Sequence, residues 1–466
     1  MIGELLIRGG TLVTASESVE ADLLLRGGRI EARGRDLQTD GEVVDATGQL
    51  VMPGGIDTHV HLAHPIDRMG IETADDFYSG TVAAACGGVT TIIDFALQRR
   101  GDGLTEALER RDRQARGQAV IDYGFHVIVT DVRPGVLAEI PACIEAGFPS
   151  FKIYMTYSDK IVRDDALLRI LEVTATEGGL VYLHCENDCA INHLIERFLA
   201  AGKTQPAFHA SSRPPQVEDE ATYRAIMLAE LTGASICVAH VTSAAAMGHV
   251  DRARRRGLPV VCETCPQYLV LTESEYRCDR GFEAAKFVCS PPLRDAEHGE
   301  ALWRGLSDGS IQQVASDHAP FDFAEQKQRG RDDFTSIPNG LPGIETRLPL
   351  LFSEGVDKGR INVNQFVALV ATNPAKMFGL YPRKGSLEEG ADADLVLIDP
   401  QREVQIDHAR LHSQVDYNPY QGMRLRGVPT LTLSRGEVVS RLGEPTAERG
   451  RGELLSRAAC ERSALP

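Results

Sequence analysis

Three histidines lie within six residues of the chain, in the segment THVHLAH at positions 58–64. His59 and His61 are spaced i, i+2, and on an extended strand this spacing points both imidazoles to the same face. Neutral imidazole is the commonest protein ligand of zinc-like ions, so the two rings could supply half of a tetrahedral site. Two hydrogen-bonded histidines at a strand end would show the same spacing, so further ligands must decide between these interpretations.

Strand-like segments alternate with amphipathic helical segments through the middle of the chain. The predicted strands are the one that carries His59, followed by 90–95, 123–130, 150–155, 180–185, 235–241, 260–264 and 312–318. Helical patterns such as 164–179 and 217–233 end in glycine, as helix C-termini often do. Eight such units in roughly 300 residues predict a (β/α)8 barrel, although periodicity alone also permits a doubly wound sheet.

A barrel would bring scattered candidate ligands together. The C-terminal ends of all its strands meet at one face, where active sites lie. Five of the predicted strands carry a candidate metal ligand near their C-terminal end, and these candidates are His59, His61, Lys152, His184, His240 and Asp317. We therefore predict a site for two metal ions at this face. We interpret His126, on the third predicted strand, as a packed and hydrogen-bonded imidazole instead.

The two ends of the chain share a different pattern. Residues 1–50 consist of short strands broken by Gly-Gly turns, and the pattern returns at 392–400 and 430–439. We predict that both ends build one smaller β-sandwich. The predicted domains are 1–50 and 386–441 for the two parts of the sandwich, 51–385 for the barrel and 442–466 for a tail. The tail could make subunit contacts or be loose.

The composition restricts the class of protein. Of the 466 residues, 43% are hydrophobic and 25% are charged, as in ordinary globular proteins. The net charge of −17 disfavours nucleic acid, because binding to phosphates requires a basic surface. The longest apolar runs are too short to cross a bilayer. Ten cysteines without a signal segment predict free thiols in the cytoplasm, and we interpret the pair Cys262 and Cys265 as a structural coincidence.

The chain resembles the cyclic amidohydrolase family, in its dihydropyrimidinase and hydantoinase branch. The matching stretches, from about residue 50 to 350, are GGIDTHVHL, GGVTTIIDF, SFKIYMTY, LHCEN, HVTS, ETCPQYL, KFVCSPPLR, VASDHAPF and IPNGLPGIETR. The resemblance implies that a hydroxide shared by two divalent ions, zinc in the family, opens a cyclic amide to an N-carbamoyl amino acid. It also implies a homo-oligomer, either a dimer or a tetramer.

Lys152 needs a separate explanation, because an ammonium group with an ordinary pKa of about 10.4 repels a cation. The resemblance implies that Lys152 is carboxylated by CO2 to N6-carboxylysine, whose two oxygens bridge the metals. One metal then takes His59, His61 and Asp317, and the other takes His184 and His240. The alternative for Lys152 is a buried lysine paired with a carboxylate.

The resemblance also assigns roles in catalysis. Asp317 would take the proton of the attacking hydroxide and pass it to the leaving nitrogen. Tyr157 would donate to the developing oxyanion. Backbone groups at Ser290 and Asn339 would read the amide and imide edges of the ring. The alternatives are an N-cap for Asp317, a packed lid for Tyr157, and ordinary turn chemistry for the other two.

The residues after the first histidines suggest the class of substrate. Dihydroorotase and allantoinase relatives commonly carry Arg or Asn where this chain has Ala63. An alanine side chain cannot pair with a carboxylate group on a substrate. We therefore predict a dihydropyrimidine or a 5-substituted hydantoin as substrate, with allantoinase or dihydroorotase activity as the alternative. His64 lies in the loop that we expect to line the substituent pocket. Scaffold relatives have lost the metal ligands, and this chain retains all six.

Overall fold

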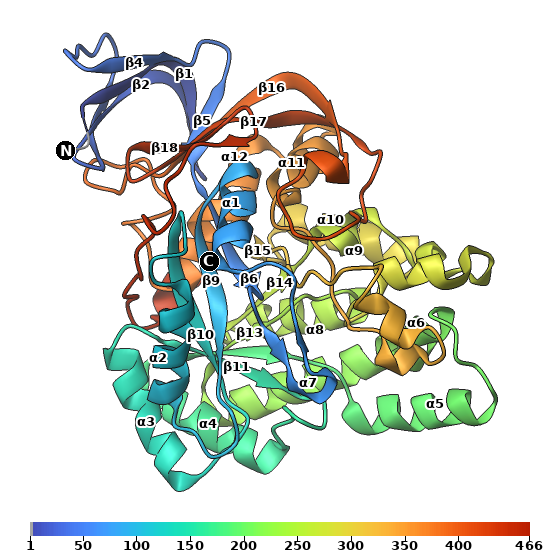
Figure 1. The fold of residues 1–466 in the computed structure, drawn as a ribbon. Coiled ribbons are helices and arrows are strands. Elements are labelled where there is room, and N and C mark those ends of the chain that lie inside the picture. Colours follow the sequence, from blue (N-terminus) through green and yellow to red (C-terminus); the bar gives the residue numbers. More distant parts are fainter. Residues whose placement is uncertain (1–2) are drawn as a thin grey trace.

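The computed structural model describes residues 3–466, and a closed barrel forms its centre (Figure 1). Its eight parallel strands are β6 (Gly55–Val60), β9 (Val89–Leu97), β10 (Asp122–Ile128), β11 (Ser150–Tyr154), β12 (Leu180–His184), β13 (Ser235–Val238), β14 (Val260–Thr264) and β15 (Gln313–Val314). A parallel bridge between Val60 and His318 joins the first strand to the eighth. The predicted (β/α)8 barrel is confirmed.

The strands are buried because helices cover the outer face while side chains fill the inside. Strand β9, with the sequence VTTIIDFAL, is buried at every position except the last. Such continuous β-branched runs are typical of strands covered on both faces. Two strands end three or four residues before their predicted ends at 241 and 318: β13 ends at Val238 and β15 at Val314, before the ligand candidates His240 and Asp317. The chain leaves the sheet there, and this change of direction turns both side chains into the site.

Helices connect the strands and pack around the barrel. They are α1 (Phe77–Cys86), α2 (Leu104–Ala115), α3 (Pro134–Glu145), α4 (Asp164–Glu177), α5 (Asp188–Ala200), α6 (Ala207–Ser212), α7 (Pro215–Thr232), α8 (Ala244–Arg255), α9 (Pro266–Val270), α10 (Ala296–Asp308), α11 (Arg347–Leu351), α12 (Val363–Val367) and α13 (Asn373–Met377). Helices α4 and α7 end at Gly178 and Gly233, which adopt the left-handed conformation that caps helices. Both ends agree with the predicted glycine stops.

A second sheet combines the two ends of the chain. Its strands are β1 (Leu5–Val13), β2 (Ser18–Arg26), β3 (Arg29–Gly34), β4 (Glu42–Asp45), β5 (Leu50–Pro53), β16 (Leu395–Gln405), β17 (Arg424–Ser434), β18 (Glu437–Arg441) and β19 (Glu444–Pro445). Strands β5 and β16 pair antiparallel and join the two halves, seen as blue and red ribbons side by side in Figure 1. Leucines such as Leu12, Leu23 and Leu397 from both halves share one buried core. The β-rich module from both chain ends is confirmed, and its predicted bounds stay a prediction.

The C-terminal tail packs across the end of the barrel that is opposite the strand C-termini. Tyr123, near the start of β10, exchanges backbone hydrogen bonds with Glu453 and Leu455. Arg457 is buried beneath the strands and donates to Ser150 Oγ at 2.9 Å and to the carbonyl of Phe125. This stretch of the tail is therefore not loose, and its contribution to subunit contacts stays a prediction.

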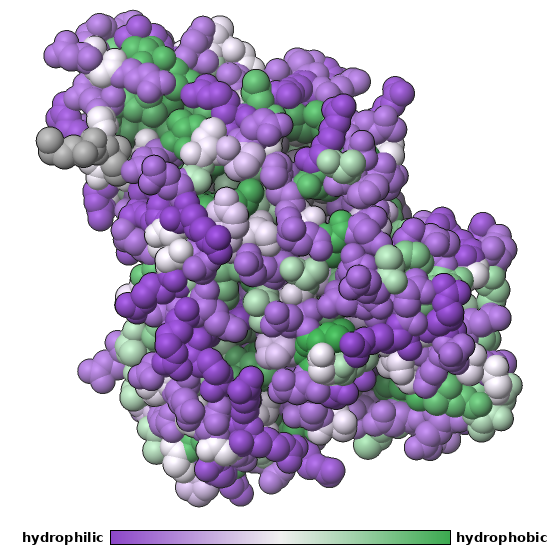
Figure 2. All heavy atoms as spheres, in the orientation of Figure 1, coloured by the Kyte–Doolittle hydropathy of each residue, from purple (hydrophilic) through white to green (hydrophobic). Residues whose placement is uncertain are grey.

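The visible surface is mostly hydrophilic, as the face drawn in Figure 2 shows. Among the helices of residues 3–466, none has both the length and the apolar character that crossing a bilayer requires. All ten cysteines are free thiols, including Cys262 and Cys265 of the C-x-x-C pair.

Candidate active site and metal centre

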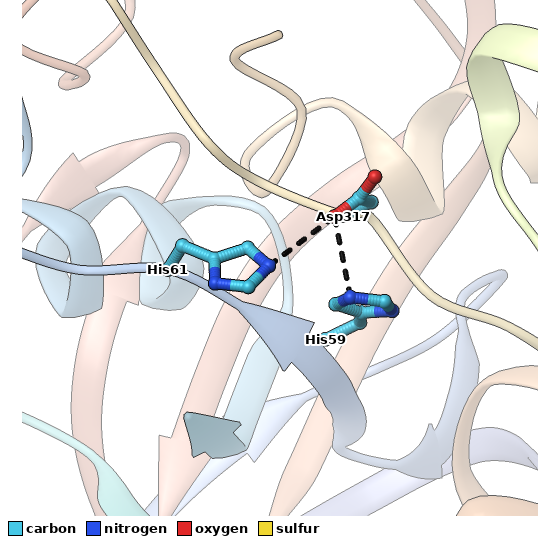
Figure 3. Close-up of side chains that lie close together, drawn as sticks. All are labelled: His59, His61 and Asp317. Atoms are coloured by element: carbon cyan, nitrogen blue, oxygen red, sulfur yellow. Dashed lines mark ion pairs between the residues drawn. The ribbon is translucent and has the colours of Figure 1, made fainter. Parts of the chain in front are cut away.

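Strand β6 and the segment after β15 bring three predicted ligands together (Figure 3). His59 Nε2 lies 3.3 Å from Asp317 Oδ1, and His61 Nε2 lies 3.5 Å from the same oxygen. The two histidines point to one side of their strand, as the i, i+2 spacing predicts. The three ligand atoms lie within 4.8 Å of one another, close enough to hold a single metal ion.

The remaining candidates line the same cavity. His184 comes from the end of β12 and His240 from the segment after β13, and their ring centroids are 4.5 Å apart. The ring of His240 also lies 5.3 Å from that of His59. Lys152 enters from the middle of β11 and lines the cavity with these histidines. The structure therefore brings all six predicted ligands to one cavity.

Lys152 occupies an unusual environment for an ammonium group. The residue is fully buried, and its Nζ has no hydrogen-bond partner among the described residues. Nζ lies 4.5 Å from the centroid of the Tyr182 ring and 5.4 Å from that of Phe95. Burial lowers the pKa of Lys152 to about 8. Among the described residues, Lys152 therefore does not form the ion pair with a carboxylate that the alternative requires.

Burial also favours the neutral form of His61, His184 and His240, which is the form that binds metals. It lowers the pKa of His61 to about 3 and that of His240 well below the ordinary value. Burial alone would raise the pKa of Asp317, but His59, His61 and His240 hold it well below its usual range. Asp317 is therefore a carboxylate anion that faces several imidazoles, a donor set that suits a divalent cation.

Two acidic residues orient the histidines, and sequence reasoning assigned them no role. Glu263 Oε1, at the end of β14, lies 2.5 Å from His59 Nδ1, so Nε2 is the nitrogen left for a metal. Glu186 Oε2 lies 2.7 Å from His184 Nε2, and Arg213 pairs with the same carboxylate at 2.5 Å. Carboxylates of this kind fix the ring orientation of metal ligands. The sequence offered one indication of their importance, because Glu263 lies in the motif ETCPQYL and Glu186 in the motif LHCEN.

Three site residues adopt backbone conformations with positive φ. The angles are +69° at Tyr157, +35° at His240 and +49° at Asp317. Non-glycine residues rarely adopt this region, and the resulting strain concentrates at functional sites. In each case the backbone has just left a barrel strand, so the turn directs the side chain into the cavity.

The predicted substrate-binding residues line the cavity as well. Tyr157, Ser290 and Asn339 contribute to its wall, and Asn339 Nδ2 donates to Ser290 Oγ at 3.0 Å. Burial raises the pKa of Tyr157, so its hydroxyl stays protonated and able to donate. His64 also lines the cavity, and its ring lies 4.9 Å from that of His61. Contact of these four residues with a substrate stays a prediction.

His126 behaves as expected for a packed imidazole. Its Nδ1 lies 2.7 Å from Ser150 Oγ and its Nε2 lies 2.9 Å from the carbonyl oxygen of Thr58. Both ring nitrogens are therefore occupied, which confirms the interpretation that His126 is not a ligand.

A second cluster of possible ligands lies where the loop between β16 and β17 meets the barrel, and the sequence did not reveal it. It consists of Cys86, Glu345 and His412. The backbone N–H of His412 donates to Glu345 at 2.8 Å, and its Nδ1 lies 2.9 Å from the other carboxylate oxygen. Hydrogen bonds to Cys86 and Glu345 raise the pKa of His412 to about 10. A protonated ring has no lone pair for a metal, so the cluster is best described as an ion pair that holds the loop.

Replacing His412 with glutamine should therefore destabilise the protein in a pH-dependent way. The folded pKa of about 10 exceeds the ordinary 6.5, so the stabilisation is complete below about pH 6.5, falls between these values and disappears above pH 10. Denaturant unfolding of both proteins across this range measures it. Exposed His408, in the same loop, provides the control by the same substitution. A stability difference that does not change with pH would contradict the ion pair.

Comparisons with known proteins agree with this geometry. Residues 50–439 match the model of the amidohydrolase family. A D-hydantoinase from Geobacillus stearothermophilus is 50% identical over 456 residues, which cover 97% of this chain and 96% of that protein. A crystal structure of D-hydantoinase superposes with a TM-score of 0.96 at 47% identity, covering 98% of this chain and 100% of the other. A dihydropyrimidinase from Brevibacillus agri NCHU1002 gives 0.96 at 45% identity, covering 98% and 99%.

The family match and the identity over nearly the whole length confirm the resemblance seen in the motifs. This chain belongs to the amidohydrolase family and, within it, to the branch of hydantoinases and dihydropyrimidinases.

Proposed function

We propose that this protein hydrolyses the cyclic amide bond of 5-substituted hydantoins and dihydropyrimidines and releases N-carbamoyl amino acids. The observation that carries the proposal is the convergence of six potential metal ligands on one cavity. Relatives named D-hydantoinase at 44% to 50% identity support hydantoins as substrates and the D enantiomer as the preferred one. Ala63 supports a ring without a carboxylate arm, as argued from the sequence.

The donor set fits two divalent ions, and we propose zinc. His59, His61 and Asp317 would hold one ion and His184 and His240 the other, with Lys152 between them as N6-carboxylysine. The buried Nζ of Lys152 without a hydrogen-bond partner supports this modification, because a carboxyl group there would face the surrounding imidazoles. Two such ions supply a hydroxide at neutral pH and polarise the amide carbonyl that is attacked.

The residues of the chain would perform the remaining steps. Asp317 has a second carboxylate oxygen that can accept the proton of the nucleophile and then donate it to the ring nitrogen as the amide bond breaks. The Tyr157 hydroxyl would donate to the carbonyl oxygen as negative charge develops on it. The backbone around Ser290 and Asn339 would orient the ring. We further propose a homo-oligomer, which rests on the resemblance alone.

A panel of ring substrates tests the proposal. Purified protein with measured metal content is incubated with dihydrouracil, hydantoin, both enantiomers of 5-phenylhydantoin, allantoin and dihydroorotate, and ring opening is followed by ultraviolet absorbance. We expect turnover of dihydrouracil and hydantoin. We also expect the D enantiomer of 5-phenylhydantoin to be turned over faster than the L enantiomer. Turnover of allantoin or dihydroorotate alone would contradict the proposed substrate class, and metal-free inactive protein would contradict the proposed chemistry.

Tyr157→Phe should lower kcat by about 10² to 10³ with little change in KM. Removing one donor to an oxyanion usually costs this much, because that hydrogen bond strengthens only in the transition state. Steady-state kinetics with hydantoin measures the effect. Tyr154→Phe is the matched control, since Tyr154 lines the same cavity and should retain activity near the wild-type rate. Equal kinetics for the two variants would remove Tyr157 from the mechanism.

A further inference from the structure

Lys327 is a buried cation that the proposed mechanism does not use. It lies in the 3-10 turn η4 (Lys327–Gly330), which follows the last barrel strand, and it is fully buried. Its Nζ donates to the carbonyl oxygens of Val288, Pro338 and Gly340 at 3.2, 3.1 and 3.0 Å. All three acceptors are uncharged, and burial lowers the pKa of Lys327 to about 7. Burying a cation is costly, so these contacts must offset a substantial desolvation penalty.

The three carbonyls belong to the two backbone stretches that carry Ser290 and Asn339. These stretches also contact each other directly, because the Gly340 N–H donates to the Val288 carbonyl at 3.0 Å. Space around them is tight: a Cβ at Gly340 would lie 2.3 Å from the carbonyl oxygen of Ala319. An ammonium with three donors satisfies three backbone acceptors at once, whereas an apolar side chain would remove this donor from the Pro338 and Gly340 carbonyls and leave Val288 with the Gly340 N–H alone. Lys327 thus joins the two stretches at a single point.

The same turn also contacts a second part of the cavity wall. Gln326 Nε2 donates to the carbonyl of Glu72 at 2.8 Å, and Arg329 donates to that of Met69 at 2.6 Å. Both acceptors lie in the hairpin formed by β7 (Pro65–Ile66) and β8 (Ile71–Glu72) or in its connecting turn. This hairpin contributes Ile66 and Arg68 to the cavity lining. Residues 326–329 therefore connect the stretches at Ser290 and Asn339 with the hairpin after His64.

We propose that Lys327 is a positioning residue: it holds the two backbone stretches at Ser290 and Asn339, which would bind the ring, in their relative position. The turn that carries Lys327 fixes the distance from this backbone to the hairpin. The identity of the ligand that this backbone binds, a cyclic amide, rests on the proposed function. Contacts to the unreacting edges of the ring are made equally in the ground state and the transition state. Their loss should therefore appear in KM rather than in kcat.

Lys327→Met tests the first part, because methionine keeps an unbranched chain but offers no donor. We expect KM for hydantoin to rise at least tenfold, kcat to change less than threefold, and the metal content to stay at the wild-type value. Arg331→Met is the matched control: Arg331 is an exposed cation just beyond the same turn, and it contacts Gln328 and the ring of Phe282. Wild-type KM in Lys327→Met, or an equal change in both variants, would overturn the proposal.

Hydrogen exchange provides a readout that does not depend on turnover. The Gly340 amide should exchange at least tenfold faster in Lys327→Met than in the wild type, because its acceptor stretch is no longer held. Unchanged exchange at Gly340 would refute the positioning role even if no ring substrate were turned over. Faster exchange in a protein that opens no ring would instead place the failure in the proposed function.

Arg329→Ala tests the role of the turn in fixing the distance to the hairpin. Arg329 is exposed, and its side chain loses only its contact with Met69, so this variant also serves if Lys327→Met fails to fold. We expect the ratio of kcat/KM for D-phenylhydantoin to that for hydantoin to change at least fivefold, since the hairpin lies near the substituent. An unchanged ratio would refute the role of the turn in fixing the distance between the two parts of the wall.

Discussion

Replacing Lys152 with alanine is expected to remove the bound metal ions and to lower kcat/KM at least about a thousandfold. Stabilisation by metal ions is worth several kcal/mol, and each 1.4 kcal/mol or so is a factor of ten in rate. Tyr154, which also enters the cavity from β11, cannot be carboxylated to bridge the two groups of histidines, so Lys152 has no substitute on that strand. Metal analysis of the dialysed variant, together with hydantoin turnover, measures both effects.

The neighbouring Lys160 supplies the control for this experiment. It lines the same cavity but is not among the predicted ligands, so Lys160→Ala should keep its metals. Short carboxylates or high bicarbonate should restore part of the metal content of Lys152→Ala, since either can occupy the space left by a carboxylated lysine. Full metal occupancy in Lys152→Ala without any additive would end the carboxylysine hypothesis.

Asp317→Asn should lower kcat by about 10² to 10⁴, the range for removal of a general base. The amide keeps one oxygen near His59 and His61, but it cannot accept and return a proton. The protein should therefore fold normally and retain much of its metal, and the loss should appear in turnover. Single-turnover kinetics with hydantoin separates this chemical step from binding and product release.

Asp159→Asn is the matched control for the second prediction. Asp159 lines the same cavity and carries the same charge, but it lies in the loop after Tyr157 rather than beside the histidines. Its amide variant should retain kcat near the wild-type value. A kcat within tenfold of wild type for Asp317→Asn would assign the proton transfer to another group.

Much of the fold could be predicted because the barrel is a repetition of local patterns. The run 90–95 lies within β9, the run 180–185 exceeds β12 by one residue, and the glycines at 178 and 233 end α4 and α7. The short strands β13 and β15 were predicted too long, because nothing in the local sequence marks the last residue of the ladder. The backbone turns that expose His240 and Asp317 depend on contacts outside these segments, so local propensity does not reveal them.

The sequence by itself determined the identity of the six ligand candidates. Their place near the ends of parallel strands is a local property, and barrel geometry then forces strand ends to meet. Only the tertiary structure decided how these side chains are held: Glu263 against His59, Glu186 and Arg213 behind His184, and Lys327 under the backbone at Ser290 and Asn339. Except for Glu186, which lies two residues from His184, these partners are distant in the chain and come from different elements: Glu263 from strand β14, Arg213 from the connection after α6, and Lys327 from the turn η4. Such contacts depend on how strands and loops pack together in three dimensions, and no periodicity in the sequence records that packing.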